Sequence, residues 1–426
     1  MIRLKVRIIS LFMLFCGVTA AIAKEIKPTL LVYGDGIEAF AAALQAARSN
    51  VPTVWVYEGA TYMSSVESSA LPIVCNAHLL GGIWKDLLIE TGQLKSKNDS
   101  LVIALQKDIN PRLMRNALER MLAKQQNLTL VSGTKVIGIA KGKKELTVTL
   151  SNKRKYGVRA MVDATPQGDT RQYVVSTDLF AKPSRILSLP EINADERRTL
   201  LALGEYENAL YGYRWFDVFS QSNSNVFFTA NLVQVGLDDN SLSLRANLGQ
   251  AVGAAAAYCS FFKTTADKID MRKLQTELLT FDARILPFSD ISSSDSNFKS
   301  LQKIFLVSFF PVESTEKGVL FDGNRPVSIG SVKAVFNSLY SRSQLWFVNK
   351  EGGDFELNEL LDLIKHVSLR GDEVNREVEK EWSRKFKFKG VYDPNHIVSR
   401  YEFAVLVDRY ADPYVKAIDA EGKILR

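Results

Sequence analysis

The fold is decided by one stretch near the start of the chain: Thr29-Leu-Leu-Val-Tyr-Gly-Asp-Gly-Ile-Glu-Ala-Phe-Ala-Ala-Ala-Leu-Gln-Ala-Ala-Arg48, followed shortly by Val54-Trp-Val-Tyr-Glu58. An apolar run leads into a glycine turn, then an alanine-rich helix, then a second apolar run that ends in an acid. This order is typical of a strand-turn-helix-strand unit that binds a dinucleotide.

The small residues of the turn have separate physical roles. Gly34 permits a tight turn, Gly36 lets a pyrophosphate approach the backbone, and Ala39 lets the helix pack close to the sheet. Free N–H groups and the dipole at the helix start favour phosphate. Glu58 follows Gly36 by 22 residues, near the spacing of about 20 for an acid that holds a ribose hydroxyl, which argues against NADP.

Two carboxylates support the alternative that this is an ordinary strand-helix-strand unit whose glycines only shape the turn. Asp35 lies between the glycines and Glu38 lies in the first helical turn. Both would repel a pyrophosphate, and both would stabilise the helix start unaided. The pattern therefore favours the fold more strongly than it favours nucleotide binding.

The first residues are typical of a secretory signal peptide. A basic start precedes the apolar run Ile8-Ile-Ser-Leu-Phe-Met-Leu-Phe-Cys-Gly-Val18 and a small-x-small cleavage site at Ala21-Ile-Ala23. We therefore expect an exported protein, in the periplasm, at the cell surface or secreted. The alternative is an uncleaved membrane anchor, which the short apolar run disfavours. No later stretch is long and apolar enough to span a bilayer.

Composition and charge exclude several classes of function. The 426 residues are 46% hydrophobic and 24% charged, typical of a globular protein, and the net charge is +7. Removing the signal peptide takes away three basic residues and lowers this to +4. The basic residues alternate with acids, so we expect no nucleic-acid partner. Three histidines without ligand spacing indicate no metal site. Cys75 and Cys259 are either one disulfide or two buried thiols.

Hydrophobic periodicity gives a coarse order of elements beyond the first unit. We expect a helix after Asn110-Pro111, which are a good cap and first residue. A glycine turn that enters an amphipathic helix is expected over 79–91, and the other expected helices span 193–203, 242–262, 270–279, 328–340, 356–367, 373–384 and 400–410. The other expected strands span 128–131, 135–139, 146–150, 158–162, 209–219 and 225–235.

The expected fold class is α/β: a Rossmann-like FAD-binding domain, a small inserted β-rich substrate region and a helical C-terminal domain. The predicted divisions are 1–23 signal peptide, 24–170 FAD-binding domain first part, 171–240 reduced substrate-like insert, 241–288 FAD-binding domain second part, 289–300 linker, and 301–426 helical C-terminal domain. The serine- and aspartate-rich composition of 289–300 predicts the linker.

Three separated stretches together resemble the secreted bacterial FAD-dependent oxidoreductases of the glutathione-reductase-like fold, a branch sometimes labelled xanthan lyase. They are the opening unit, the strand ending in Val162-Asp-Ala-Thr-Pro-Gln-Gly-Asp169, and Asn247-Leu-Gly-Gln-Ala-Val-Gly-Ala-Ala-Ala-Ala257. The resemblance covers roughly 28–170 and 245–285. It implies FAD as cofactor and a flavin-dependent oxidation or reduction as the activity.

The resemblance also implies a set of cofactor-binding residues. They are Gly34, Gly36 and Ala39, with Asp35, Ile37 and Glu38, in the pyrophosphate turn; Glu58 at the adenosine ribose; Val136 near the adenine; Ala164 and Thr165 beside the phosphates; Gly168 and Asp169 at the ribityl chain; and Gly249, Gln250 and Ala251 at a helix start beside the flavin pyrimidine. The sequence departs from the family pattern at Pro166-Gln167, which replaces Gly-Asp. No catalytic acid or base stands out.

The end of the chain carries its own resemblance. Ser399, Arg400 and Glu402 match the core of the helix of S-layer-homology modules, which implies a cell-envelope polymer as partner. The alternative is an amphipathic helix packed on its neighbours. Val327-Ser328 and Val398-Ser399 both open expected helices, a weak sign of an internal repeat.

Two functions follow from these observations. The first is an exported FAD-dependent oxidoreductase acting on a small molecule, with a carbohydrate as one candidate. The second is a catalytically degenerate flavoprotein fold that serves as a cell-envelope binding or surface-assembly module.

Overall fold

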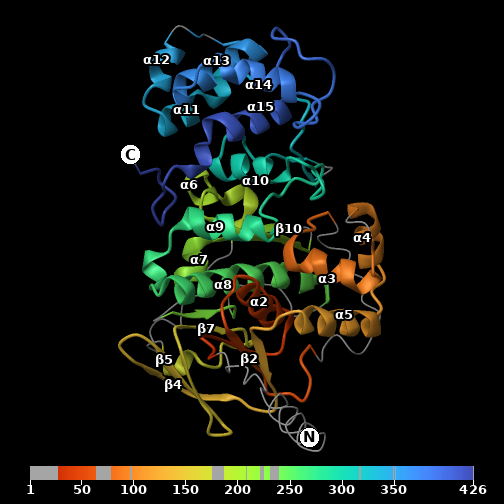
Figure 1. Cartoon of the computed structure of the whole chain (residues 1–426), viewed down its shortest axis with the longest axis vertical. Helices are drawn as coiled ribbons and strands as arrows, with labels where there is room; N and C mark the ends of the chain where they lie inside the picture. Colours follow the sequence, from red (N-terminus) through yellow and green to blue (C-terminus); the bar gives the residue numbers. More distant parts are fainter. Residues whose placement is uncertain are drawn as a thin grey trace, which may run out of the picture.

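The computed structural model describes residues 27–63, 78–95, 98–174, 187–207, 209–220, 225–230, 239–315, 318–348, 350 and 352–425. The expected signal peptide and Cys75 lie outside these residues, as do residues 231–235 of the last expected strand. The elements follow one another along the long axis of the molecule, from the β-sheets of the N-terminal part at one end to the helices of the C-terminal part at the other (Figure 1).

A five-stranded parallel sheet forms the centre of the N-terminal part, in the order β11-β7-β1-β2-β3. Its strands are β1 (Leu30–Tyr33), β2 (Thr53–Val56), β3 (Leu128–Val131), β7 (Ala160–Asp163) and β11 (Val226–Phe228). β1, β2 and β7 are fully buried, and apart from Thr53 and Asp163 they are apolar, as expected of a parallel sheet covered on both faces.

Alternate residues of each strand face two different layers. Leu30, Val32 and Trp55 pack with helices in one hydrophobic cluster. Leu31 and Val54 belong to the other cluster, with the antiparallel strands of the second layer. That layer is β4 (Val136–Lys141), β5 (Leu146–Leu150) and β6 (Lys155–Val158). Successive side chains of a strand point to opposite faces, so β1 lies between the helical layer and the antiparallel layer. The turn that follows β1 therefore begins between these two layers.

Two helices dominate the helical layer and lie against each other (Figure 1). α2 (Ile37–Arg48) follows the glycine turn, and α8 (Leu242–Phe262) packs along it. A Cβ added to Gly253 of α8 would lie 2.6 Å from the Cα of Ala42. Small residues therefore let the two backbones touch. The layer also contains α3 (Gly82–Gly92), α4 (Asp99–Gln106), α5 (Pro111–Ala123) and α9 (Met271–Thr280).

The insert between β7 and α8 is a small antiparallel sheet in the order β8-β10-β9. Its elements are β8 (Leu187–Ser188), α6 (Ala194–Arg197), β9 (Leu200–Tyr206), β10 (Ala209–Arg214) and α7 (Trp215–Ser220). The helix expected over 193–203 is wrong beyond α6. The apolar run that starts at Leu200 pairs with β10 instead, and a Cβ on Gly204 would meet Leu244 of α8 at 2.4 Å. The strand expected over 209–219 ends at Arg214.

Helices form the C-terminal part, as the sequence predicts. They are α10 (Phe298–Val307), α11 (Ile329–Leu339), α12 (Ser343–Phe347), α13 (Leu357–Ser368), α14 (Glu373–Glu381) and α15 (Arg400–Leu406), and an antiparallel pair of short strands, β12 (Ser314–Thr315) and β13 (Gly318–Val319), lies between α10 and α11. The Rossmann-like α/β class with a helical C-terminal region is thereby confirmed.

The serine-rich stretch expected as a linker is bonded to α3 and α4. The carboxylate of Asp99 accepts hydrogen bonds from the hydroxyl of Ser292 at 2.7 Å and the backbone N–H of Ser293 at 2.8 Å. Lys85 donates to Asp99 at 2.6 Å and to the hydroxyl of Ser293 at 2.7 Å. These contacts tie the start of the C-terminal part to the N-terminal one, while the predicted domain divisions stay a prediction.

Three loop-helix units of the C-terminal part are joined in a ring of backbone hydrogen bonds. Val327 N–H donates to Val398 at 3.1 Å, Val398 N–H to Phe355 at 2.8 Å, and Phe355 N–H to Val327 at 2.9 Å. The next residues, Ser328, Glu356 and Ser399, are the N-caps of α11, α13 and α15. The weak sign of a repeat in the sequence thus corresponds to three equivalent positions.

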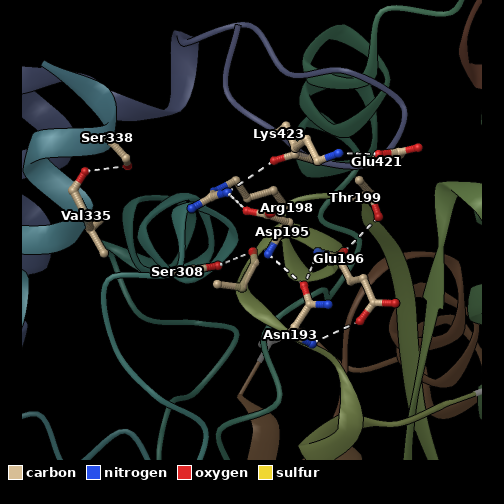
Figure 2. A network of polar contacts seen from close by, with 12 residues as sticks. Asn193, Asp195, Glu196, Arg198, Thr199, Ser308, Val335, Ser338, Glu421 and Lys423 are labelled. Carbon is tan, nitrogen blue, oxygen red and sulfur yellow. Dashed lines mark hydrogen bonds and ion pairs between the residues drawn. The ribbon is translucent and has the colours of Figure 1, made fainter.

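The chain end returns to the insert (Figure 2). Arg198, just after α6, donates to the carbonyl of Gly422 at 3.1 Å and pairs with Asp195. Asn193 caps α6 in a capping box with Glu196. Gly422 has a φ of +85°, and a Cβ there would lie 1.9 Å from the carbonyl oxygen of Asp195. Only glycine fits this contact.

Candidate functional site

The turn after β1 has the geometry that the glycine pattern predicts. Gly34 has a φ of +130°, which side chains rarely adopt, and a Cβ there would lie 2.7 Å from the carbonyl carbon and oxygen of Ala164. The backbones that leave β1 and β7 therefore touch at the carboxyl edge of the sheet. In open α/β sheets, this edge is where ligands bind.

The N-terminus of α2 lies at this edge. Gly36 is its N-cap in extended conformation, and among the described residues no capping side chain bonds to the first N–H groups of the helix. The first N–H groups of a helix have no partner within the helix, and they attract anions together with the helix dipole. Ile37, Glu38 and Ala39 of this first turn are buried. The turn therefore offers backbone donors rather than side chains to a phosphate.

A buried ion pair lies directly beside the turn. Arg245 of α8 donates from Nε to Oε1 of Glu38 at 2.5 Å and from Nη2 to Oε2 at 2.8 Å. A Cβ on Gly36 would lie 2.8 Å from Glu38 Oε2 and 3.3 Å from Arg245 Nη2. The sequence predicts that Glu38 repels a pyrophosphate. The structure adds a bidentate cation that neutralises it.

A tyrosine hydroxyl is buried near this pair. Tyr213 of β10 is fully buried, and its hydroxyl has no hydrogen-bond partner among the described residues. Burial, and then the charges of Glu38 and Asp217, raise the pKa of Tyr213 far above its usual value. The group therefore stays a neutral hydroxyl.

Glu58 lies at the end of β2, where the ribose acid is expected. Its carboxylate is exposed and accepts a hydrogen bond from the hydroxyl of Tyr33 at 2.5 Å. Burial, and then this bond, raise the pKa of Tyr33 strongly. The chain after β3 runs alongside, with Gly133 N–H donating to Gly59 at 3.2 Å. Val136 follows as a buried residue of β4 in the hydrophobic cluster of the second layer, and its contact with adenine stays a prediction.

The loop after β7 is organised around one buried carboxylate. Asp163 accepts hydrogen bonds from the backbone N–H and hydroxyl of Thr165, at 3.0 and 2.6 Å, and from those of Thr170, at 2.8 and 2.6 Å. Thr165 in turn accepts from Asp169 N–H at 2.9 Å. Pro166 and Gln167 are exposed, so the residues that depart from the family pattern form the outer bend of a fixed loop.

The charge of Glu58 acts on Asp169. Burial raises its pKa, and so do the charges of Asp163 and Glu58. Gly168 has a φ of +65°, and a Cβ there would lie 2.7 Å from Nε of Arg171. Arg171 itself donates to Ala230 O at 2.6 Å and lies over the ring of Phe228. Arg171 is thereby turned toward Ala230 and Phe228, while Asp169 is exposed on the bend.

The predicted helix start at Gly249 is wrong. Gly249, Gln250 and Ala251 lie in the interior of α8, and a Cβ on Gly249 would meet the carbonyl oxygen of Glu38 at 2.4 Å. Gln250 is buried, accepts from Ile83 N–H at 3.1 Å and donates to Gln45 at 2.9 Å. These residues dock α8 onto the helices beside it. A cofactor contact for them stays a prediction.

Sequence reasoning missed three side chains of this edge: Tyr33, Thr170 and Arg245. Thr170 directly follows the quoted motif, and two threonines spaced around a strand-end aspartate are a usable signal for such a loop. Arg245 lies 207 residues from its partner Glu38, and nothing local connects them.

A histidine and a cysteine often serve as a catalytic acid, base or nucleophile, but the pKa values of His78 and Cys259 make these two residues unsuited to such a role. Burial, and then the charge of Arg284, lower the pKa of His78 to about 4. Burial raises the pKa of Cys259, a buried free thiol, to about 12. In the described residues no group of side chains has the makings of a metal site, and no helix is long and apolar enough to cross a membrane.

A hollow of about 820 Å³ lies elsewhere, at the opposite end of α2. It is lined by Arg48, the last residue of that helix, and by Ala257 and Phe261 of α8 and Thr276 of α9. A helix of this length separates the hollow from Gly36 by roughly 18 Å. It is therefore distinct from the nucleotide edge.

The described edge fits the ADP half of FAD. The Gly34 turn and the open start of α2 would hold the pyrophosphate, with Arg245 supplying positive charge beside it. Glu58 and Asp169 would accept hydrogen bonds from sugar hydroxyls, which are donors. The types of these polar groups are those that a dinucleotide requires, and their contacts with it stay a prediction.

Comparisons with known proteins agree with this geometry. Residues 29–172 match the family model described as FAD dependent oxidoreductase. No curated protein sequence matches the chain. The match does not favour the alternative of a degenerate surface module.

Solved structures show distant similarity. Bacillithiol disulfide reductase from Staphylococcus aureus is 17% identical over 34% of this chain and 39% of its own, with a TM-score of 0.23. Thioredoxin reductase from T. acidophilum is 15% identical over 33% and 36%, with a TM-score of 0.22. The tetracycline destructase Tet(51) is 12% identical over 67% and 92%, with a TM-score of 0.35.

The chain spans about two fifths or less of the two reductases, and at these TM-scores the three likenesses carry no argument about function. The choice of cofactor rests instead on the family match and on the geometry of the sheet edge. Over residues 29–172 the chain is similar to FAD-dependent oxidoreductases and has a Rossmann-like fold that suits FAD as the cofactor.

Proposed function

We propose that this protein is an exported FAD-dependent oxidoreductase that acts on a small molecule, with a carbohydrate as one candidate class. When bound, FAD supplies two-electron transfer. The chain's own contribution in the described residues is to hold the ADP half. The turn at Gly34 and the start of α2 bind phosphate, and Glu58 orients the ribose.

The observation that carries the proposal is the pairing of an open helix start with two charged groups on either side of it. Arg245 lies beside Gly36, and Glu58 lies at the end of the next strand. A phosphate site and a sugar site after two neighbouring strands of one sheet suit a dinucleotide better than a single phosphate. An acid at the ribose also favours a nucleotide without a 2′-phosphate.

Export supports a particular choice of electron partner. The basic, apolar and small-residue order of residues 1–23 is typical of a cleaved signal, and nicotinamide cofactors are scarce outside the cytoplasm. The second partner of the flavin is then oxygen, a quinone or another protein. Mass spectrometry of the secreted or periplasmic protein tests cleavage after Ala23, and a mature chain that begins at Met1 contradicts it.

The main test is a flavin spectrum. The chain from residue 24 to 426 is purified and scanned for oxidised-flavin absorbance near about 450 nm. We expect a yellow protein, or a colourless one that becomes yellow with added FAD. Substrate classes are then screened by anaerobic bleaching of that band. A folded protein that is colourless and fails to bind added FAD overturns the proposal.

A second activity is proposed for the C-terminal part, which is binding of a cell-envelope polymer. The ring that joins Val327, Phe355 and Val398 favours it, because a repeated unit offers repeated surfaces. Arg400 does not contribute to such a surface, because its side chain is buried and donates to Phe321 O at 3.1 Å. Co-sedimentation of the whole chain with purified cell walls tests this, and loss of all sedimented protein at moderate salt contradicts it.

A further inference from the structure

The donors of Arg245 are only partly used. A guanidinium carries five N–H groups. Two donate to Glu38, and in the described part of the chain no other hydrogen bond involves Arg245. One of the remaining donors is on Nη2, which is 3.3 Å from the place of a Cβ on Gly36 and therefore lies beside the turn. The side chain is 10% exposed, so it reaches the edge without lying in open solvent.

The pair is not required to dock the two helices. Gly249 and Gly253 already bring the backbone of α8 against Glu38 and Ala42, at contacts that a Cβ would block. A buried ion pair also adds little net stability on average, because both charges lose water. Its place beside the phosphate turn therefore calls for another explanation.

We propose that Arg245 is the cation of the pyrophosphate site and that Glu38 weakens its hold on the nucleotide. This rests on the proposed function, since it requires that the edge binds FAD. The guanidinium donates to the phosphates with the N–H groups that Glu38 leaves free. The carboxylate holds the guanidinium in place and offsets its charge, so the affinity for a doubly charged linkage is moderated rather than maximal.

The experiment compares ligands with and without phosphates. Binding of ADP, FAD and adenosine is measured by calorimetry on the FAD-free chain. E38Q keeps the shape of the side chain and removes its charge. We expect it to bind ADP about tenfold more tightly, because a hydrogen-bonded charge contributes about 1.5–3 kcal/mol and 1.4 kcal/mol is a factor of ten. R245M is expected to bind ADP at least about tenfold more weakly than the wild-type chain.

A double variant keeps the test valid if R245M fails to fold. E38Q/R245M leaves no buried charge, and we expect its ADP affinity to fall below that of the wild-type chain by about tenfold. Adenosine lacks phosphates, so its affinity is expected to be the same in every variant. The matched control is R48M/D86N at the other end of α2, where Arg48 Nη1 lies 2.8 Å from Asp86 Oδ2. It is expected to bind ADP like the wild-type chain.

The outcomes separate two failures. If the wild-type chain binds ADP and FAD but E38Q/R245M keeps wild-type affinity for both, Arg245 only cancels Glu38 and this inference is overturned alone. If adenosine binding changes as much as ADP binding, the pair acts on the fold and the inference is also overturned. If the folded wild-type chain binds neither ADP nor FAD, the proposed function fails first and the role of Arg245 falls with it.

Discussion

Tyr33 ends β1, Glu58 follows the end of the neighbouring parallel strand β2 by two residues, and the hydroxyl of Tyr33 donates to the carboxylate of Glu58 at 2.5 Å. The tyrosine is buried while the acid is exposed. An otherwise mobile carboxylate at the end of β2 is thereby held by a side chain fixed in the core. A ribose acid must point one way to receive two hydroxyls, and this bond supplies that orientation.

The first prediction concerns that bond. Tyr33→Phe removes the hydroxyl and leaves the packing of the ring. We expect adenosine affinity to fall by up to about tenfold, because a hydrogen bond to a charged group contributes about 1.5 kcal/mol or more. Calorimetry with adenosine measures it, and Tyr57→Phe, also on a buried ring, is the control. An unchanged affinity in Tyr33→Phe would mean that Glu58 needs no support or does not touch the ribose.

The second prediction concerns the turn. Gly36→Asp adds a side chain whose Cβ would lie 2.8 Å from Glu38 Oε2, and it brings a third carboxylate to the phosphate position. We expect the protein to lose FAD while its far-UV circular dichroism stays near native. Gly330→Ala, at a position with nothing within 4 Å of an added Cβ, is the control for a glycine substitution. A yellow Gly36→Asp protein would show that the pyrophosphate lies elsewhere.

Sequence patterns predict an element well when contacts within that element determine its structure. The helix α5 begins at Pro111 with Asn110 as its cap, as expected, because the cap side chain bonds to the first N–H groups of its own helix. The apolar run at Leu200 was predicted as helix because its residues suit either state. Its pairing with β10, which places Tyr211 opposite Gly204, decided for strand. Such pairing is a tertiary effect that periodicity does not contain.

At the candidate site, too, the features set by local contacts could be predicted from the sequence and those set by tertiary contacts could not. Gly34 was predictable because its backbone conformation is a local demand of the turn. Glu38 was predicted as a repulsive charge, and that is incomplete, because the cation that neutralises it comes from α8. The position of Asp169 near Glu58 was likewise hidden until β1, β2 and β7 were placed side by side.

The third prediction concerns the buried hydroxyl of Tyr213. In the described part of the structure it lacks a hydrogen-bond partner, and a buried polar group without one costs about 1–3 kcal/mol. Tyr213→Phe removes the group and keeps the ring. We expect the free energy of unfolding to rise by about 1 kcal/mol, measured by urea denaturation. A destabilised variant would reveal that the hydroxyl has a partner, with Glu38 the first candidate.

The last prediction uses the charge of Asp169. Burial, Asp163 and Glu58 raise its pKa in the folded protein, so the folded state binds its proton more readily than the unfolded state does. The charged form therefore destabilises the fold at neutral pH, and this penalty is relieved as pH falls through the raised pKa. Asp169→Asn is expected to melt at a higher temperature than the wild-type protein at pH 7, and the gap is expected to close toward about pH 4, near the usual pKa of an aspartate.

The same variant separates stability from binding. If Asp169 accepts a hydroxyl of the bound cofactor, Asp169→Asn weakens FAD binding at pH 7 even as it stabilises the FAD-free chain, because an amide is a poorer acceptor than a carboxylate. For Asp169→Asn we therefore expect a lower affinity for FAD together with a higher melting temperature of the FAD-free chain. A gain in both would show that Asp169 faces no part of the cofactor and is an acid held too close to Glu58 and Asp163.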